Sequence, residues 1–189
     1  MTLFRTVGPE LEPVTLVEAK QNLRVDHDSE DDLIEGLIRA AREEVEASCG
    51  LALVEQAWRL ALDAVPRSGR ILLRRHPVIA VSAVTVYGDG GEASLVDPAG
   101  YQLDAHARPA RLHLGAIAAP GLVMNGIEID FTAGFGESGA DVPDLLKRAM
   151  LLLVAHWYEF RSSYGAADQP VSLPAGYERL IAPYRARRL

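Results

Sequence analysis

Residues 127–157 of the chain, IEIDFTAGFGESGADVPDLLKRAMLLLVAHW, join a strand pattern to a helix pattern through three glycines. Ile127, Ile129 and Phe131 alternate with polar residues, which is the period of a half-buried strand. Pro143 suits the first turn of a helix, and the helix that we predict over residues 143–160 is apolar on most faces. Such a helix is buried, by its own subunit or by a neighbouring one. Its apolar residues are Leu145, Leu146, Ala149, Met150, Leu152, Leu153, Val154 and Trp157.

The three glycines, Gly134, Gly136 and Gly139, fit the dinucleotide-binding spacing G-x-G-x-x-G. In that motif the glycine turn leads directly into a helix whose N-terminal amides face the pyrophosphate. Here three residues separate Gly139 from Pro143, and the acidic residue required about twenty positions later falls on Glu159, inside or at the end of the helix. The rest of the chain is also too short for a second βαβ unit. We therefore interpret the glycines as a strand-to-helix connector.

The N-terminal third has the pattern of two helices. Thr15 and Glu18 form a capping-box signature, which predicts a short helix from there to about Arg24. A longer helix is predicted to begin with Ser29 as its cap and to end at Gly50, in the left-handed conformation. Its apolar residues recur at three- and four-residue steps and are Leu33, Ile34, Leu37, Ile38, Ala41 and Val45. The polar residues assigned to its other faces are Arg39, Arg42, Glu43 and Glu46.

The middle of the chain has the pattern of short strands. The candidate strands are QAWRLALD, RILLR, VIAVSAVTVYG, YQLD, RLHL and GIEIDFTA, and the GDGG stretch at 88–91 supplies a tight turn. No helix of useful length fits between them, and parallel strands need such crossovers. The sheet is therefore predicted to be mostly antiparallel.

These patterns together predict an α+β fold, with a helical core and an inserted, mostly antiparallel β-rich region. The 189 residues fit a single domain. Within it we expect a helical hairpin over 1–55, the β-rich insertion over 56–135 and a buried helix over 140–162. Residues 163–189 are expected to form a loop and a C-terminal partner-binding segment.

Composition narrows the classes of function. The formal net charge is −7, which argues against a dedicated nucleic-acid binder, because such affinity comes from neutralising phosphates with lysine and arginine. Cys49 is the only cysteine, so the chain has no intramolecular disulfide. The longest apolar run is too short to span a bilayer, and we expect no membrane association. No signal segment is recognisable at the start, so the expected site of synthesis is the cytoplasm.

No catalytic or metal-binding constellation is recognisable. The acidic stretch 25–32, VDHDSEDD, breaks the calcium-loop pattern in both registers, and suits a helix N-terminus with carboxylates in its first turn. The five histidines lack metal-ligand spacing, and no serine lies in a G-x-S-x-G elbow. Cys49, near a helix end, is interpreted as a packing residue rather than a nucleophile. We therefore predict no catalytic residue, no metal and no cofactor.

Two features favour assembly with other proteins instead. One is the apolar helix 143–160, for which burial in the subunit's own core is the competing interpretation. The other is the C-terminus, which is rich in tyrosine and arginine, residue types enriched at interfaces; a solvated, frayed end is the alternative. The candidate partner-binding residues are Tyr177, Arg179, Tyr184, Arg185, Arg187 and Arg188.

Nearly the whole chain resembles the head–tail connector, or adaptor, proteins of long-tailed phages and of gene transfer agents. The resemblance is most specific in TLVEAKQNLRVDHDSEDDLI near the start and in AGFG followed by VPDLLKRAMLLLVAHWYEFR. It implies a structural, non-enzymatic subunit of a ring, typically of twelve copies, at the head–tail junction of the particle. The implied partners are the portal protein, through the C-terminal segment, and a tail-side stopper or head–tail joining protein. DNA is expected to pass through the ring without sequence-specific binding. The alternative function is a small α+β enzyme or small-molecule-binding protein.

Overall fold

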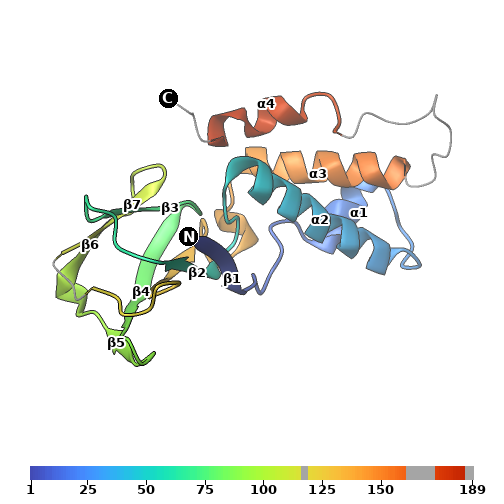
Figure 1. Cartoon of the computed structure of the whole chain (residues 1–189). Coiled ribbons are helices and arrows are strands. Elements are labelled where there is room, and N and C mark those ends of the chain that lie inside the picture. Colours follow the sequence, from blue (N-terminus) through green and yellow to red (C-terminus); the bar gives the residue numbers. More distant parts are fainter. Residues whose placement is uncertain (116–118, 161–172, 186–189) are drawn as a thin grey trace, which may run out of the picture. The chain divides into compact units, whose positions relative to one another are not determined.

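The structure is a computed structural model and describes residues 1–115, 119–160 and 173–185 (Figure 1). The chain divides into two compact units. The β unit consists of residues 1–9 and 55–135, and the helical unit of residues 10–54 and 136–189. The predicted α+β fold is confirmed.

The β unit contains, among the described residues, a five-stranded sheet in the order β1-β2-β8-β4-β5 and a three-stranded sheet in the order β3-β7-β6. Every strand pair is antiparallel, as predicted. All six predicted strand segments form strands, and residues 88–91 join β4 to β5 in a hairpin. The strands are β1 (Thr2–Val7), β2 (Gln56–Leu62), β3 (Arg70–Leu73), β4 (Val78–Tyr87), β5 (Ala93–Leu95), β6 (Tyr101–Asp104), β7 (Ala110–Leu114) and β8 (Ile127–Ala133).

The two faces of β8 differ as the alternation predicts. Ile127, Ile129 and Phe131 are buried. On the opposite face the Arg59 guanidinium of β2 donates two hydrogen bonds to Asp130, at 2.7 and 2.9 Å. The bidentate bond to Asp130 outweighs the effect of burial and raises the pKa of Arg59. An apolar layer on one face and ion pairs on the other fix the register, since a one-residue slip would exchange them.

Strand β1 was not predicted. It pairs with β2 at the edge of the five-stranded sheet, and its side chains are mostly exposed. A strand with so little burial has no alternation of its own to detect. It forms because β2 offers an open edge, which is a tertiary effect that overrides local propensity.

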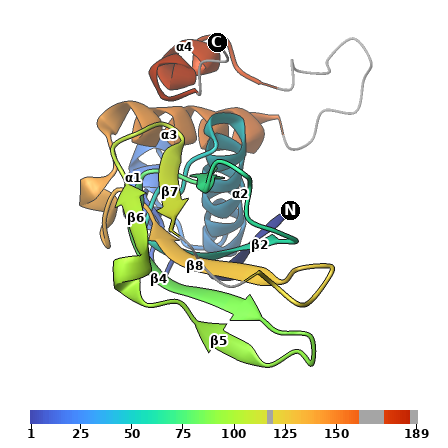
Figure 2. The same ribbon diagram turned by 60° about the vertical axis from the view of Figure 1, so that its left-hand side comes forward.

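The helical unit consists of four α-helices among its described residues. They are α1 (Leu16–Leu23), α2 (Asp31–Cys49), α3 (Asp144–Glu159) and α4 (Tyr177–Ile181). Helix α3 packs against α1, α2 and α4, and α4 runs along α3 in both views (Figures 1 and 2). None of the described helices is long and apolar enough to cross a membrane.

The predicted capping box at the start of α1 is confirmed. The Thr15 hydroxyl accepts a hydrogen bond from the amide of Glu18, and the Glu18 carboxylate accepts one of 2.7 Å from the amide of Thr15. That backbone bond is the main cause of the lowered pKa of Glu18. Lys147 of α3 contacts the same carboxylate at 3.1 Å. One residue pair therefore both caps α1 and ties it to α3.

The predicted cap of α2 is wrong. The helix begins at Asp31, and Glu30 occupies the cap position without a side-chain hydrogen bond. The Ser29 hydroxyl instead contacts Nδ1 of His27 at 2.9 Å. The ammonium of Lys20 lies 2.6 Å from Asp28 and 2.8 Å from Asp31, so a cation from α1 holds the turn that leads into α2. The C-terminal prediction is confirmed, because Gly50 has a φ of 68°.

The predicted apolar helix forms as α3, but only one side of it is fully buried. The buried side chains are Leu146, Ala149, Met150, Leu153 and Val154. Leu145 is exposed, and Trp157 is only half-buried. The apolar pattern therefore overestimates the part of the helix that this subunit covers, and leaves apolar surface on its other side.

Candidate assembly surfaces

The C-terminal segment is anchored to the helical unit by the buried side of α4. Tyr177 and Ile181 are fully buried, and the Cys49 thiol lies 4.0 Å from the carbonyl oxygen of Ile181. Burial raises the pKa of Tyr177 to about 12. Tyr177, one of the candidate partner-binding residues, is thus covered by its own subunit. Its side chain positions α4 instead of presenting a contact.

The other side of this segment carries exposed charge. Arg179 and Arg185 are exposed, and Tyr184 is half-buried. Arg185 forms an ion pair with Glu178, with a second contact of 3.0 Å. The structure therefore brings two of the candidate arginines to the exposed side of one short segment. Arg187 and Arg188 lie outside the described residues.

Cys49 has the environment of a packing residue. Its side chain is buried at the end of α2, and burial raises the pKa of the thiol to about 11. The thiolate is the nucleophilic form of cysteine, and this pKa leaves almost none of it at neutral pH. The environment of Cys49 therefore favours the packing interpretation.

The acidic stretch before α2 is organised by Lys20. Its ammonium forms ion pairs with Asp28 and Asp31, and the pKa of Lys20 is raised mainly by its hydrogen bond to Asp28. Within the part of the chain that the structure describes, no group of three or more metal-ligating side chains converges.

The glycine stretch between β8 and α3 forms a connector, as predicted. A single 3-10 turn, Gly139–Asp141, is capped reciprocally by Ser138 and Asp141. Helix α3 begins only at Asp144, so the glycines do not cradle its N-terminus. A β-carbon on Gly139 would lie 2.7 Å from the carbonyl oxygen of Pro13. The glycine is needed because another backbone segment passes this closely.

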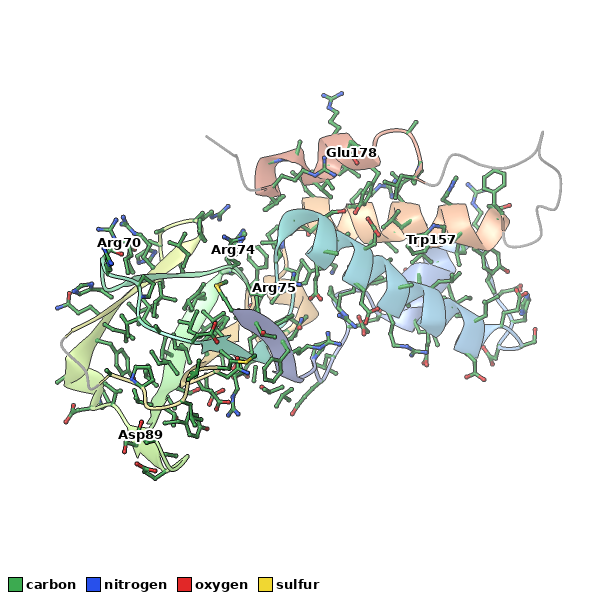
Figure 3. All side chains as sticks on the ribbon, in the orientation of Figure 1. Arg70, Arg74, Arg75, Asp89, Trp157 and Glu178 are labelled. Carbon is green, nitrogen blue, oxygen red and sulfur yellow. The ribbon has the colours of Figure 1, made fainter. Side chains whose placement is uncertain are left out.

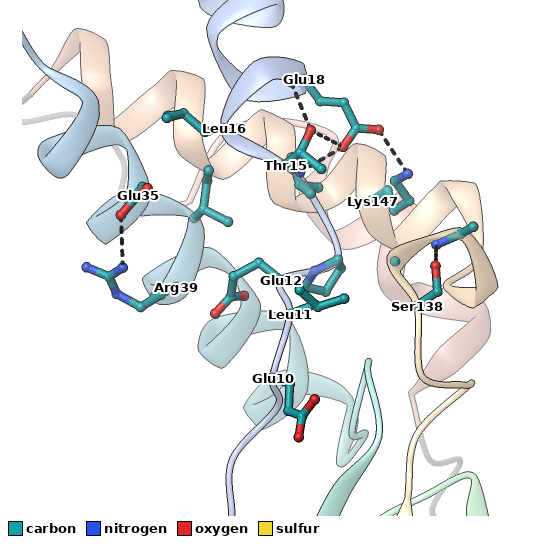
Figure 4. A pocket seen from close by; sticks show the side chains of 15 residues that line it. Glu10, Leu11, Glu12, Thr15, Leu16, Glu18, Glu35, Arg39, Ser138 and Lys147 are labelled. Atoms are coloured by element: carbon teal, nitrogen blue, oxygen red, sulfur yellow. Dashed lines mark hydrogen bonds and ion pairs between the residues drawn. The ribbon is translucent and has the colours of Figure 1, made fainter. Parts of the chain in front are cut away.

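A groove of about 660 Å³ lies within the helical unit (Figure 4). The segment of residues 10–16 forms one wall, and α2 and the 3-10 turn before α3 contribute the others. Leu11 is 60% exposed at this groove. Sequence patterns gave no sign of it, because its walls come from segments more than a hundred residues apart.

The two cations that line the groove are each paired with a carboxylate. Figure 4 shows Glu35 with Arg39 and Glu18 with Lys147, at 3.7 and 3.1 Å. Both cations at this groove are therefore engaged in ion pairs. Chemistry requires a nucleophile or base aimed at a common point, and these side chains face their partners.

Arg42, which the sequence assigned to a polar face of α2, is buried. Its guanidinium contacts Glu12 at 2.9 Å and Glu46 at 3.0 Å. Burial opposes the charged form, but Glu46 and Glu12 outweigh it and raise the pKa of Arg42. The other oxygen of Glu46 accepts a hydrogen bond of 2.9 Å from the amide of Leu53. This network ties the 10–16 wall of the groove to α2 and to the residues that follow it.

Comparison with known proteins identifies the family. Residues 13–87 match the model of the Phage gp6-like head-tail connector protein family. The whole chain also matches a solved structure described as the virion of a native gene transfer agent (GTA) particle, at 30% identity and a TM-score of 0.81 over 97% of that chain. The chain belongs to the phage gp6-like head-tail connector family. A search of curated proteins gave no match.

Two further solved structures extend the likeness of this connector. The neck of an empty GTA particle computed with C6 symmetry is 29% identical, with a TM-score of 0.82. The neck of a native GTA particle computed with C12 symmetry is 28% identical, with a TM-score of 0.81. Each comparison covers all of this chain and 97% of the other. The likeness therefore includes the β unit and the C-terminal segment, beyond the residues that the family model matches.

Proposed function

We propose that this connector is a structural subunit of the head–tail junction in a virion or gene transfer agent particle. Twelve copies form a ring beneath the capsid portal, join the portal to the tail and surround the channel through which DNA leaves. The observation that carries the proposal is the full-length likeness to chains from GTA necks computed with C6 and C12 symmetry. The role is structural, with no chemical step.

The charge distribution suits a subunit past which DNA must slide. The β unit contains eight arginines and eight carboxylate side chains, so the net charge of −7 belongs entirely to the helical unit. Strong binding to DNA depends on neutralising its phosphates with cations. A channel wall formed by the acidic unit would repel phosphate and leave DNA free to move, without sequence-specific contacts.

The portal contact is proposed for the exposed side of the C-terminal segment. Arg179 and Arg185 lie there, and the sequence continues with Arg187 and Arg188. Buried Tyr177 and Ile181 fix α4 to the helical unit, so the arginines of α4 are held in a defined position. The opposite side of the ring is left for a tail-side stopper or head–tail joining protein.

Particles made with and without the gene test this function. Cryo-electron microscopy of the neck is expected to show a ring of this chain beneath the portal, and a strain lacking the gene is expected to yield heads without tails. Restoring the gene on a plasmid is the control and should restore the ring. Tailed particles that deliver DNA normally without this chain would refute the proposal.

A further inference from the structure

Charged side chains of the β unit that have no ion-pair partner among the described residues gather by sign in two different places. The stretch 65–77, VPRSGRILLRRHP, contains four arginines and no carboxylate. Arg67, Arg70 and Arg74 are exposed, and none has an ion pair with a described residue. At the β4–β5 hairpin, Asp89 and Glu92 are exposed and likewise lack a cation partner among the described residues. Figure 3 places Arg70, Arg74 and Arg75 along one side of this unit and Asp89 at another end.

The arginines form a face on the outer side of the three-stranded sheet. In β3, Arg70 and Leu72 point outward while their neighbours are buried. The register places His113 of β7 beside Arg70, and Arg111 beside Leu72. Arg74 follows directly after the end of β3. We call Arg70, Leu72, Arg74, Arg111 and His113 the arginine face.

Two shallow hollows lie along the arginine face. One, of about 430 Å³, is bounded by Arg67, Gly69 and His113. The other, of about 290 Å³, is bounded by Arg70, Arg111, His113 and Asp104, and Asp104 forms an ion pair with Arg111 there. Each is large enough to receive an apolar side chain of a partner, and each has an arginine at its rim.

The hairpin end combines acidic and apolar side chains that project into solvent. Leu95 of β5 is 77% exposed, and Val123 and Met124 are 88% and 72% exposed. The loop that carries Val123 and Met124 is fixed to the hairpin strand, because Tyr87 bonds to Gly121 and Gly126 through its backbone at 2.8 and 2.9 Å. We call Asp89, Glu92, Leu95, Val123 and Met124 the acidic tip.

The arginine face and the acidic tip complement each other in charge and in shape. A closed ring of identical subunits needs two different surfaces on each copy, one of which fits the other on the next copy. One surface here is basic and hollowed, and the other is acidic and projecting. Leu72 lies at the centre of the basic surface. An aliphatic side chain can pack against apolar groups of a protein partner, whereas a phosphate backbone presents charged oxygens to which it makes no favourable contact. The surface therefore suits a protein better than a nucleic acid.

We propose that the acidic tip of one copy docks on the arginine face of the next copy. This contact rests on the proposed ring and names the surfaces that close it. Asp89 and Glu92 face Arg70 and Arg74 across the junction, and the apolar side chains of the tip occupy the hollows. The occupant of the arginine face is thus a second copy of this chain.

A charge-swap experiment tests the contact in particles. The paired reversals R70E/R74E and D89R/E92R should each lower the number of copies per particle at least about tenfold, because like charges then oppose across every junction. Combining all four changes should restore incorporation, since opposite charges face one another again. Arg24→Glu, an exposed reversal in the helical unit, is the matched control and should have no effect. Circular dichroism of each variant checks that it is folded.

Engineered cysteines test the same contact without relying on charge. Cys49 is buried, so new cysteines are the only accessible thiols among the described residues. Arg70→Cys with Asp89→Cys on one chain should give a ladder of covalent oligomers under oxidation, because each copy links to two neighbours. Either change alone should give dimers at most.

The outcomes separate this contact from the proposed function. A ring present in particles, with no rescue by the fourfold swap and no ladder, would overturn the contact and leave the ring standing. Absence of the chain from the neck would overturn the proposed function itself. Binding of fluorescent duplex DNA by the wild-type protein, lost in R70E/R74E and not regained in the fourfold variant, would assign the arginine face to DNA and refute the docking.

Discussion

Replacing Arg42 by methionine should destabilise the helical unit more than any exposed substitution in α2. The side chain of Arg42 is 4% exposed and that of Glu46 is 6% exposed. Removal of the guanidinium leaves the Glu46 carboxylate buried without its cation, and also removes the contact to Glu12. Loss of one partner of a buried ion pair costs about 3–5 kcal/mol. We expect the loss of unfolding free energy in Arg42→Met to be at the lower end of this range, because Glu12 is partly exposed and water can solvate its carboxylate in place of the arginine.

A second variant separates the buried charge from the packing of the side chain. In R42M/E46Q the buried position 46 is neutral, and its amide oxygen can still accept the hydrogen bond from the Leu53 amide. The double variant then loses neutral hydrogen bonds and some packing but leaves no buried charge without a partner. We expect this to lower the free energy of unfolding by about 1–2 kcal/mol. The double variant should therefore be more stable than the single one.

Urea unfolding followed by circular dichroism at 222 nm measures these differences, because the signal comes mostly from helices. Arg39→Met is the matched control: Arg39 is on the same helix, is 56% exposed and pairs with Glu35 at 3.7 Å, so its loss should cost at most about 0.5 kcal/mol. The slope of the transition should stay constant among variants. Two results would contradict this reasoning. One is that R42M lowers the free energy of unfolding no more than R39M does. The other is that R42M/E46Q is less stable than R42M, because the unpaired buried carboxylate would then not be the cause of the destabilisation.

Three further changes have outcomes that the structure fixes in direction. Gly139→Ala should lower the melting temperature clearly, while Gly8→Ala, whose β-carbon meets nothing within 4 Å, should change it far less; equal melting temperatures would contradict the close approach at Gly139. The thiol of Cys49, with its pKa raised by burial to about 11, should react with Ellman's reagent at pH 8 only after unfolding, and rapid labelling of the native protein would disprove its burial. A variant with Arg185, Arg187 and Arg188 all replaced by alanine should keep the wild-type melting temperature, since an exposed charge such as that of Arg185 contributes little to stability. The variant should retain less portal in co-purification, and either unfolding or normal attachment would refute the proposed portal contact.

Local sequence signals predicted much of this fold because their causes are local. The capping box needs only Thr15 and Glu18, three residues apart, and its geometry is that of any helix start. The alternation in β8 is equally self-contained, since Ile127 and Phe131 must share a face if the segment is extended. Gly50 ends α2 because the left-handed backbone conformation has the least steric strain in a residue without a β-carbon. Each of these features would be recognised in an isolated peptide.

The features that sequence missed depend on partners far away in the chain. Arg42 has the spacing of a solvated helix face, and only Glu12, thirty residues earlier, makes its burial possible. Ser29 has the residue type of a cap, but Lys20 from α1 holds the turn by ion pairs instead. Strand β1 exists because β2 has an open edge. Periodicity reports which face of an element is apolar, and it contains no information on which distant side chain neutralises a charge.

The partition of charge between the two units limits where copies of this chain can meet. The helical unit carries the whole net charge of −7, and the β unit is neutral. Helical units brought together in a ring repel one another, and the repulsion grows as salt is lowered because screening weakens. In the proposed docking, arginines of one β unit face carboxylates of the next, so contacts between β units have the opposite dependence on salt. If the β units close the ring, assembly should therefore show a weak net dependence on salt, whereas a ring closed by the helical units alone should assemble only at high salt.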